Sequence, residues 1–279
     1  MTAAARPIPG VGRRRVVRIL IRAFCITCIA FSAACGARRV PLPSDPGSPL
    51  PDYSQIHAEV TKSCRGARTL TAELGLRGRA GTRRLSGRLI AGFERPASMR
   101  LEAVAPFGPA GFILVTRGDQ TVLLLPRDER VVRGESAEAI LGALTGVTLG
   151  PADLQAMLTG CIVPESKAVG GRLHANGWAS IDLAGGATMY LRRMGAWQIS
   201  AGRRDGWEVE YPMWQATFPQ VIRLRSAADP VTVEMTATLA QIEVNTDLKP
   251  ETFVVDVPTG TAPLSLDELR EAGPLGEKP

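Results

Sequence analysis

Apolar and polar side chains alternate with a period of two over several stretches of the chain. Such alternation is typical of antiparallel strands that bury one face and expose the other to water. The clearest case runs from Val231 to Leu239, where Thr and Glu occupy the intervening positions. The pattern predicts strands through Leu70–Leu76, Leu85–Phe93, Met99–Ala103, Trp197–Ala201, Trp207–Tyr211, Ile222–Leu224 and Val231–Leu239, with Phe253–Val257 as the last strand.

Two further runs, Phe112–Thr116 and Thr121–Leu125, are apolar at consecutive rather than alternate positions. A strand of this composition is typically buried on both faces. We therefore expect a hairpin in this region that is covered on both sides of the sheet.

Elsewhere the apolar positions recur every three or four residues, which indicates helices. The first predicted helix spans residues 52–65, with Asp52 and Gln55 at the spacing of a capping box and Gly66 at its end. Two short helices follow the predicted hairpin, and one more closes the chain. Their apolar and boundary residues are Ala137, Ile140, Leu141, Leu144 and Gly146, then Pro151, Leu154, Met157, Leu158 and Gly160, then Leu264–Ala272.

The predicted order is a helix, about six strands, two helices and about five strands, without regular strand–helix–strand alternation, so a parallel α/β fold is not expected. The pattern favours a mainly β fold with some α. We predict one strongly curved antiparallel sheet, an incomplete β-barrel, with helices packed on one side as a lid.

The helices and sheet could close into a solid core or leave an apolar cavity between them, and the pattern leaves both alternatives open. Keeping a sixteen-carbon chain out of water requires on the order of 12 kcal/mol, at about 0.8 kcal/mol per CH₂ group. A lipid carrier must therefore offer a comparable apolar surface. The candidate lining residues are Leu74, Leu76, Leu85, Leu89, Phe93, Met99, Leu101, Phe112, Leu114, Leu141, Leu144, Leu154 and Met157.

The N-terminal region has the features of a bacterial secretory signal. Six arginines precede an apolar run, Ala23–Ala34, which is shorter than the about 20 residues that a membrane-spanning helix needs. Small residues and Cys35 end the run in a pattern that resembles a lipobox, so we expect Cys35 to carry lipid. The predicted organisation is a signal peptide (1–34), the lipidated cysteine with a Pro-rich tether (35–51), a domain (52–258) and a tail with a short helix (259–279).

The net positive charge of the chain lies entirely within this predicted signal. The chain has 33 Lys and Arg against 27 Asp and Glu, but residues 1–34 hold six of the arginines and no acid. The rest is formally neutral, whereas a nucleic-acid-binding protein should keep a basic footprint after processing. We therefore expect no nucleic-acid partner. Cys25 and Cys28 lie in the discarded run, so they do not indicate a redox or zinc site.

Cys64 and Cys161 remain after Cys35. In an oxidising compartment they could form a disulfide that closes a loop of about 100 residues and adds roughly 4 kcal/mol of stability. The alternative is two separately buried thiols, and the sequence does not decide between them.

Catalytic chemistry has little support in the sequence. The two histidines, His57 and His174, lie on a predicted helix and in a Gly-rich region, where each is more simply an incidental polar residue. The motifs of nucleophile elbows, zinc proteases and phosphate-binding loops are missing from the sequence. We expect no catalytic residue, no metal site and no cofactor, and we do not expect an enzyme.

Four segments carry a family resemblance: Ala105–Leu114, a Pro-x-Gly turn running into an apolar strand; Ile140–Gly160, the paired helices; and Trp207–Tyr211 and Phe218–Leu224, two late strands. In this order they resemble the LolB-like outer-membrane lipoproteins of the LolA/LolB-like lipoprotein-sorting group. The resemblance spans residues 52–244, which is most of the chain after the signal.

The resemblance implies an incomplete antiparallel barrel whose helical lid covers a cavity for the acyl chains of lipoproteins. It implies anchoring through Cys35 on the periplasmic face of the outer membrane. It also implies a membrane-insertion loop in which Phe107, between Pro106 and Gly108, projects outward; the alternative is a Phe107 folded back into the core.

The expected function is to receive lipoproteins, with a LolA-like carrier as partner, and to insert them in the outer membrane. The alternative is a structural or sensory envelope lipoprotein that uses the same fold to bind a protein partner without carrying lipid. Three features depart from the family or qualify the anchor. Ser32 stands where a lipobox usually has Leu. Gly36 is not the Asp that retains some lipoproteins at the inner membrane, which favours the outer membrane. The residues after Val244 are unmatched.

Overall fold

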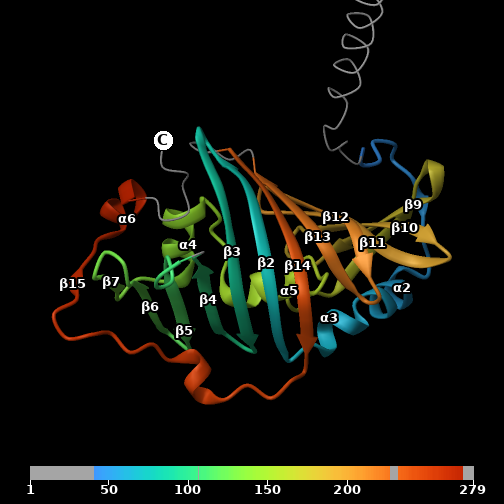
Figure 1. The fold of residues 1–279 in the computed structure, drawn as a ribbon. Helices are drawn as coiled ribbons and strands as arrows, with labels where there is room; N and C mark the ends of the chain where they lie inside the picture. The colour runs from blue at the N-terminus through green and yellow to red at the C-terminus, as the bar shows by residue number, and fades with distance from the viewer. Residues whose placement is uncertain (1–40, 106, 227–231, 273–279) are drawn as a thin grey trace, which may run out of the picture. The chain divides into compact units, whose positions relative to one another are not determined.

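One open, curved sheet contains all the strands of the described residues, which are 41–105, 107–226 and 232–272 of this computed structural model (Figure 1). Within that part of the chain the strand order is β1-β8-β9-β10-β11-β12-β13-β14-β2-β3-β4-β5-β6-β7-β15. Neighbouring strands are antiparallel, except that β15 runs parallel to β7. The strands are β1 (Ser48–Pro49), β2 (Thr69–Ala80), β3 (Arg83–Glu94), β4 (Ser98–Val104), β5 (Ile113–Arg117), β6 (Gln120–Leu125), β7 (Arg130–Arg133), β8 (Ala168–Leu173), β9 (Trp178–Leu183), β10 (Thr188–Met194), β11 (Ala196–Arg204), β12 (Trp207–Gln215), β13 (Phe218–Ser226), β14 (Val233–Val244) and β15 (Ala262–Pro263).

The sheet consists of two meanders, β2 to β7 and β8 to β14, that meet where β14 pairs with β2. In this junction Leu239 lies opposite Leu74, and Ala237 lies opposite Leu76. The pairing brings the last long strand of the chain beside the first, so one continuous apolar face runs across both meanders. The prediction of a mainly β fold with a strongly curved antiparallel sheet is confirmed.

The helices are α2 (Tyr53–Val60), α3 (Lys62–Gly66), α4 (Ala137–Thr145), α5 (Pro151–Leu158) and α6 (Leu266–Ala272), with 3₁₀ turns η1 (Ala175–Gly177) and η2 (Pro250–Phe253). Figure 1 shows α4 and α5 on one face of the sheet, behind β2, β3 and β14. Helix α2 packs against β8 and β11. At Gly171 of β8, a Cβ atom would lie 2.3 Å from Cβ of Tyr53, so only glycine allows this approach.

The predicted boundaries of the first three helices hold, with two corrections to the first of them. The first helix is divided at Thr61, and Asp52 makes no side-chain capping bond there. Helix α4 begins as expected, with the hydroxyl of Ser136 accepting from the Ala139 amide, and ends at Gly146, whose φ is +77°. Helix α5 begins at Pro151 and its last helical residue is Leu158. As predicted, Gly160 closes it: this residue follows the C-cap Thr159 and has a φ of +95°.

Three strands that the alternation did not reveal, β8 to β10, precede the predicted late strands. Strand β8 contains Gly170 and Gly171 and has no buried position, so it has no apolar stripe. Strand β9 is buried at nearly every position, so polar and apolar residues do not alternate along it. In β8 and β9, the lack of two distinct faces therefore removed the period-two signal on which the prediction depended. Strand β10 does alternate in burial from Thr188 to Leu191 and was missed nevertheless.

The predicted last strand, Phe253–Val257, is wrong. Residues 250–253 form the 3₁₀ turn η2, and residues 254–258 pair with no strand in the described sheet. The carbonyl oxygens of Thr252 and Val254 instead accept from the Arg100 guanidinium, at 3.4 and 3.1 Å. A side-chain donor thus replaces the ladder bonds that a strand would have needed.

This turn contributes to the cover over the hairpin β5–β6. Side chains on both of its faces are buried, Leu114 and Leu123 on one and Val115 and Leu124 on the other. Helix η2 contacts β4 and β5, and its Phe253 is itself buried. The expectation of a hairpin covered on both sides is therefore confirmed.

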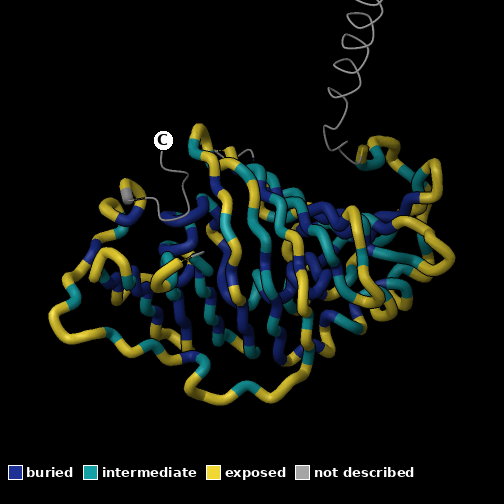
Figure 2. Tube along the Cα trace, viewed as in Figure 1, coloured by how far each residue is buried: buried dark blue, intermediate teal, exposed yellow. Residues whose placement is uncertain are grey.

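The C-terminal segment runs past β4 and β5 to the far edge of the sheet, where β15 pairs with β7 (Figure 1). The predicted terminal helix is present as α6, which begins at Leu266 rather than at Leu264. Its capping box is formed by Ser265 and Glu268, whose carboxylate accepts from the Ser265 amide at 2.8 Å. Leu264 and Leu269 join the main core, and α6 contacts α4. Figure 2 shows buried positions along the strands and α4, and exposed positions along the connection from β14 to β15.

Candidate functional site

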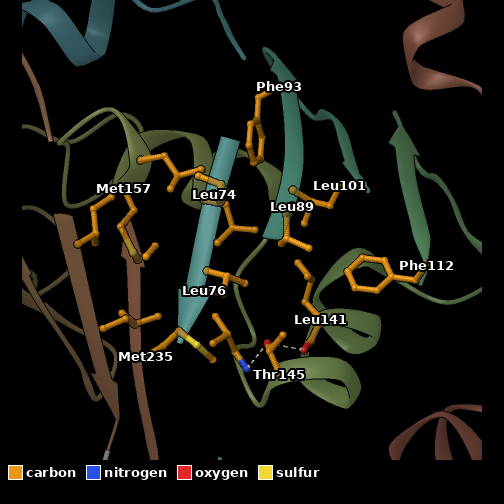
Figure 3. Close-up of a pocket in the computed structure, with 16 residues that line it drawn as sticks. Leu74, Leu76, Leu89, Phe93, Leu101, Phe112, Leu141, Thr145, Met157 and Met235 are labelled. Atoms are coloured by element: carbon orange, nitrogen blue, oxygen red, sulfur yellow. Dashed lines mark hydrogen bonds between the residues drawn. The ribbon is translucent and has the colours of Figure 1, made fainter. Parts of the chain in front are cut away.

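An apolar cavity of about 100 Å³ lies between the sheet and helices α4 and α5. In Figure 3, Leu74 and Leu76 of β2 and Leu89 of β3 lie on one side of it, and Leu141 of α4 and Met157 of α5 lie on others. The lining residues are Leu74, Leu76, Leu89, Phe93, Leu101, Phe112, Leu141, Thr145, Val147, Leu154, Met157, Leu158, Ile222, Leu224, Met235 and Ala237.

The structure brings nine of the thirteen predicted lining residues to this cavity and places four elsewhere. Leu85, Met99, Leu114 and Leu144 are buried in the core and do not line the cavity. Strand parity, and helical periodicity for Leu144, gave their inward direction correctly. It did not show where the sheet and the helices leave a gap rather than direct contact.

Sequence reasoning missed the contribution of β13 and β14 to the lining. Ile222, Leu224, Met235 and Ala237 all belong to stretches whose alternation was recognised. Their place opposite α4 and α5 depends on the pairing of β14 with β2, which joins residues more than 150 positions apart. No local signal in the sequence specifies that pairing.

Thr145 is the one hydroxyl-bearing residue among the described lining residues, and its hydrogen bonds are satisfied internally. Its Oγ1 donates to the Leu141 carbonyl at 2.8 Å and accepts from the Val147 amide at 3.1 Å (Figure 3). The other lining side chains are hydrocarbon, aromatic or thioether groups. The cavity therefore suits an apolar ligand and offers no free polar group for a polar one.

The size of the cavity limits what it can hold in this conformation. An engineered protein cavity of about 150 Å³ accommodates one benzene molecule. The space of about 100 Å³ is thus too small for a sixteen-carbon chain. An acyl ligand of that length requires a lining element to move.

Helix α5 is fastened to the sheet by polar contacts. The buried Tyr211 hydroxyl donates toward the carbonyls of Met157 and Cys161, at 3.2 and 3.3 Å, and its burial raises the pKa of the phenol. The amide of Gln155 donates to Arg68 O at 3.1 Å. Asp153 pairs with Arg204 at 2.6 Å. These contacts fix both ends of α5.

A disulfide adds a covalent connection at the same place. Cys64 of α3 and Cys161, just after α5, are bonded, with their Cα atoms 5.8 Å apart and a sequence separation of 97. In the chain-entropy model a loop of this length contributes roughly 4 kcal/mol. Of the two alternatives left open by the sequence, the structure contains the bonded pair.

Helix α4 has fewer polar contacts. Within the described residues, its side-chain hydrogen bonds are local, from the Ser136 cap to the Thr145 bonds described above. Its remaining attachment is apolar packing against the sheet and α6. Of the two cavity helices, α4 therefore needs the smaller number of hydrogen bonds to be broken if it moves.

An exposed loop follows β4. Phe107 is 91% exposed, so it projects from the surface rather than folding into the core. The Arg127 guanidinium holds the loop backbone, donating to the carbonyls of Phe107 at 2.9 Å and Pro109 at 3.1 Å. Gly108 has a φ of +77°, a conformation that favours glycine. Pro106 lies outside the described residues, as does Cys35.

Comparison with known proteins yields structural likeness only. No family model matches the chain, and no curated protein matches it in sequence. Solved structures that resemble it include a DUF1329 family protein from Desulfovibrio piger (TM-score 0.49, 10% identity, covering 74% of this chain and 98% of that one). A LolA superfamily protein from Nitrosomonas europaea has a TM-score of 0.49 and 10% identity, covering 72% of this chain and 97% of that one. The lipoprotein LppX from Mycobacterium tuberculosis has a TM-score of 0.30 and 12% identity, covering 71% and 99%. At these TM-scores we take no family, ligand or activity from the likeness.

His57 is buried on α2, and His174 is held by polar contacts beside the sheet. His174 Nε2 lies 2.8 Å from the Ser180 hydroxyl, and its Nδ1 lies 3.4 Å from an Asp45 carboxylate oxygen. The connectivity resembles a catalytic triad, but Ser180 is buried in the middle of β9, between β8 and β10. A reactive serine needs an exposed hydroxyl and free amide donors beside it. The group instead fastens Asp45, within the predicted tether, to the sheet.

The predicted tether is accordingly not free along its whole length. Strand β1, at Ser48–Pro49, pairs with β8, and the Leu50 amide donates to Gly171 O at 3.0 Å. In the described residues, no group of three or more His, Cys, Asp or Glu side chains is arranged to hold a metal ion. No helix of that part of the chain is long and apolar enough to span a bilayer.

Proposed function

We propose that this protein is a membrane-anchored lipoprotein of the bacterial envelope that shelters acyl chains between its curved sheet and helices α4 and α5. The supporting observation is the cavity, whose described lining is apolar apart from one internally satisfied hydroxyl. In this proposal the protein receives lipoproteins, with a LolA-like carrier as partner, and inserts them in the outer membrane from its periplasmic face. Cys35 carries the anchor.

Uptake in this proposal requires α4 to move away from the sheet while α5 stays in place. The contacts of Tyr211 and Gln155, with the disulfide, hold α5, whereas apolar packing holds α4. A displaced α4 would expose apolar surface to water, and an entering acyl chain would cover it again. At about 0.8 kcal/mol per buried CH₂, a long chain offsets that exposure.

Delivery in this proposal uses Phe107 as the apolar contact with the bilayer. The side chain is almost fully exposed, and Arg127 orders the backbone beneath it, so an insertion-ready conformation needs no refolding. Transfer to the membrane then follows the difference in free energy between the acyl chain in the cavity and in the bilayer.

The small cavity volume favours a second candidate, an envelope lipoprotein that uses this fold to bind a protein partner and carries no lipid. Native mass spectrometry after incubation with diacylglyceryl peptides separates the two. The carrier retains acyl ligand at a defined stoichiometry, whereas the protein-binding module keeps its apo mass.

Ala237→Phe gives the carrier a site-specific test. Ala237 lines the cavity, and a phenyl ring there fills most of the available space. We expect this variant to lose acyl binding while retaining its circular dichroism spectrum. The matched control is Ala240→Phe, on the same strand but at an exposed position. Equal acyl binding by both variants, or none by the parent protein, would contradict the carrier function.

A further inference from the structure

The hairpin β2–β3 carries an unusual concentration of positive charge. Between Glu73 and Glu94 the sequence contains five arginines and no acidic residue. Four of them, Arg77, Arg79, Arg84 and Arg88, are exposed. In the register of the hairpin, Arg79 lies opposite Arg84. Arg77 lies opposite Ser86, and Arg88 lies opposite Gly75. All four arginines are therefore on the same side of the sheet. Because side chains alternate across a strand, this face is opposite to the cavity.

On strands β11 to β14, the arginines of this face are paired with carboxylates of neighbouring strands. Arg203 pairs with Glu208 at 3.0 Å, and Arg225 pairs with Glu208 and with Glu234, each at 3.4 Å. The register continues from Glu234 to Arg79. In the described part of the chain, however, no carboxylate lies within ion-pair distance of the four hairpin arginines. Like charges directly opposite each other are unfavourable in a sheet, which indicates a role outside the fold for Arg79 and Arg84.

These arginines border an open groove that reaches the exposed loop. Arg77, Arg84 and Arg88 line it, together with the hydroxyl-bearing residues Ser86, Thr236 and Thr238. Val104 and Ala105 line it as well, and Ala105 is two residues before Phe107. The basic face and the exposed phenylalanine are thus neighbouring parts of one surface. Hydroxyls and guanidinium groups are suitable donors for phosphate oxygens.

We propose that the outer face of hairpin β2–β3, with Arg77, Arg79, Arg84 and Arg88, docks the protein on the headgroups of anionic phospholipids. The occupant follows from charge complementarity, because four exposed cations meet no described carboxylate, and from the adjacent Phe107. A single apolar side chain gives weak membrane contact, and a basic patch beside it supplies the second attachment. The inference rests on the proposed membrane-delivery role and assigns the lipid class of its docking surface.

The test uses full-length protein bound to vesicles, with the tryptophan fluorescence of Phe107→Trp as the reporter. The unsubstituted protein gives the background signal of the four native tryptophans. Brominated phosphatidylglycerol and brominated phosphatidylcholine are compared as quenchers in mixed vesicles of the two lipids. We expect stronger quenching of Trp at position 107 by the anionic lipid. Added salt should remove the preference, because about 1 M salt shortens the Debye length to about 3 Å.

The substitutions Arg77→Gln and Arg84→Gln, combined, should also remove the preference. The ratio of docked to undocked protein should fall roughly fivefold per arginine. The matched control is Arg117→Gln with Arg172→Gln, two exposed arginines on β5 and β8, away from the groove. Unchanged thermal unfolding verifies that both double variants are folded.

Two results would overturn the docking surface: equal quenching by the two lipids, or a preference that survives in Arg77→Gln/Arg84→Gln. Failure of the docking surface can be distinguished from failure of the carrier function, because native mass spectrometry measures acyl binding separately. A protein that binds no acyl chain but prefers the anionic lipid keeps this docking surface and loses only the carrier role.

Discussion

At the scale of single residues, His57 shows how strongly burial changes a side chain that looked incidental in the sequence. It lies on α2 and is 4% exposed, and its Nε2 has no hydrogen-bond partner within the described structure. Burial, and secondarily the charge of Arg65, lowers the pKa of its imidazole. A ring in this environment is held in its neutral form.

This burial predicts a pH dependence of stability. In the unfolded chain His57 has an ordinary pKa of about 6.5, whereas the folded-state pKa is lowered, so at acidic pH the unfolded state binds more protons than the folded state. Stability should be complete above about pH 6.5 and should decrease as the pH falls below it. Urea unfolding at about pH 7.5 and about pH 5.5 measures the difference, which His57→Gln should reduce. A difference of unchanged size in His57→Gln would assign the effect to other groups.

Glu268 does not contribute to the change in stability between about pH 5.5 and about pH 7.5. Hydrogen bonds from the Ser265 amide and from the Arg130 guanidinium lower the pKa of its carboxyl to about 2. A lowered carboxyl pKa contributes stability above the unfolded-state value of about 4.3 and loses it as the pH falls toward 2. Its effect therefore lies at lower pH than that of His57.

At the scale of elements, the two cavity helices differ in how they are held. Helix α5 is fixed by hydrogen bonds, an ion pair and a disulfide, whereas α4 depends on apolar contacts and on its end at Gly146. A Cβ atom at Gly146 would lie 2.9 Å from Cγ2 of Val233 and 3.2 Å from Cβ of Ala80. The C-terminal end of α4 is therefore packed closely against the β14–β2 junction.

Gly146→Ala should accordingly destabilise the protein more than a glycine-to-alanine substitution at a site with the same left-handed backbone conformation but open space around the Cβ position. Gly134→Ala is the matched control, because its φ is +79°, close to the +77° of Gly146, and a Cβ there meets open space. The left-handed conformation costs an alanine about 1–2 kcal/mol at either site. Crowding should add about 1 kcal/mol or more at Gly146, as measured by urea unfolding. Equal losses would argue against close packing at this end of α4.

The elements also show which parts of the fold were predictable from sequence. Strands β2 to β4 and β11 to β14 were found because each has one solvent-exposed and one apolar face, which produces a period of two. Strands β5 and β6 were found as consecutive apolar runs. Strands β8 and β9 were missed because their faces are not distinct. The final predicted strand failed because Arg100 satisfies the carbonyls there.

At the scale of the whole molecule, the described unit from Leu42 onward is attached to an N-terminal segment that carries the proposed anchor. Asp45 contacts His174, and Ser48 and Leu50 bind the edge of β8, so these residues of the predicted tether are attached to the sheet. Cys35 lies outside the described residues, so its modification remains a prediction from sequence.

Lipidation at Cys35 can be tested by metabolic labelling with an alkyne fatty acid. We expect the parent protein to incorporate label and Cys35→Ala to lose it, because the thiol is the acceptor of the diacylglyceryl group. Cys28→Ala, a cysteine within the predicted signal, is the matched control and should remain labelled. Label in Cys35→Ala, or none in the parent, would contradict the proposed anchor.

The sequence by itself determined the elements with a repeating apolar face, the N-terminal signal pattern and the inward direction of most cavity residues. These are local properties, since a side chain's face depends on its parity within its own strand or helix. The tertiary structure alone decided the pairing of β14 with β2, the bond between Cys64 and Cys161, and the outward position of Phe107. It also decided which of the inward leucines border empty space. Contacts between residues far apart in the chain determine these features, and no short segment encodes them.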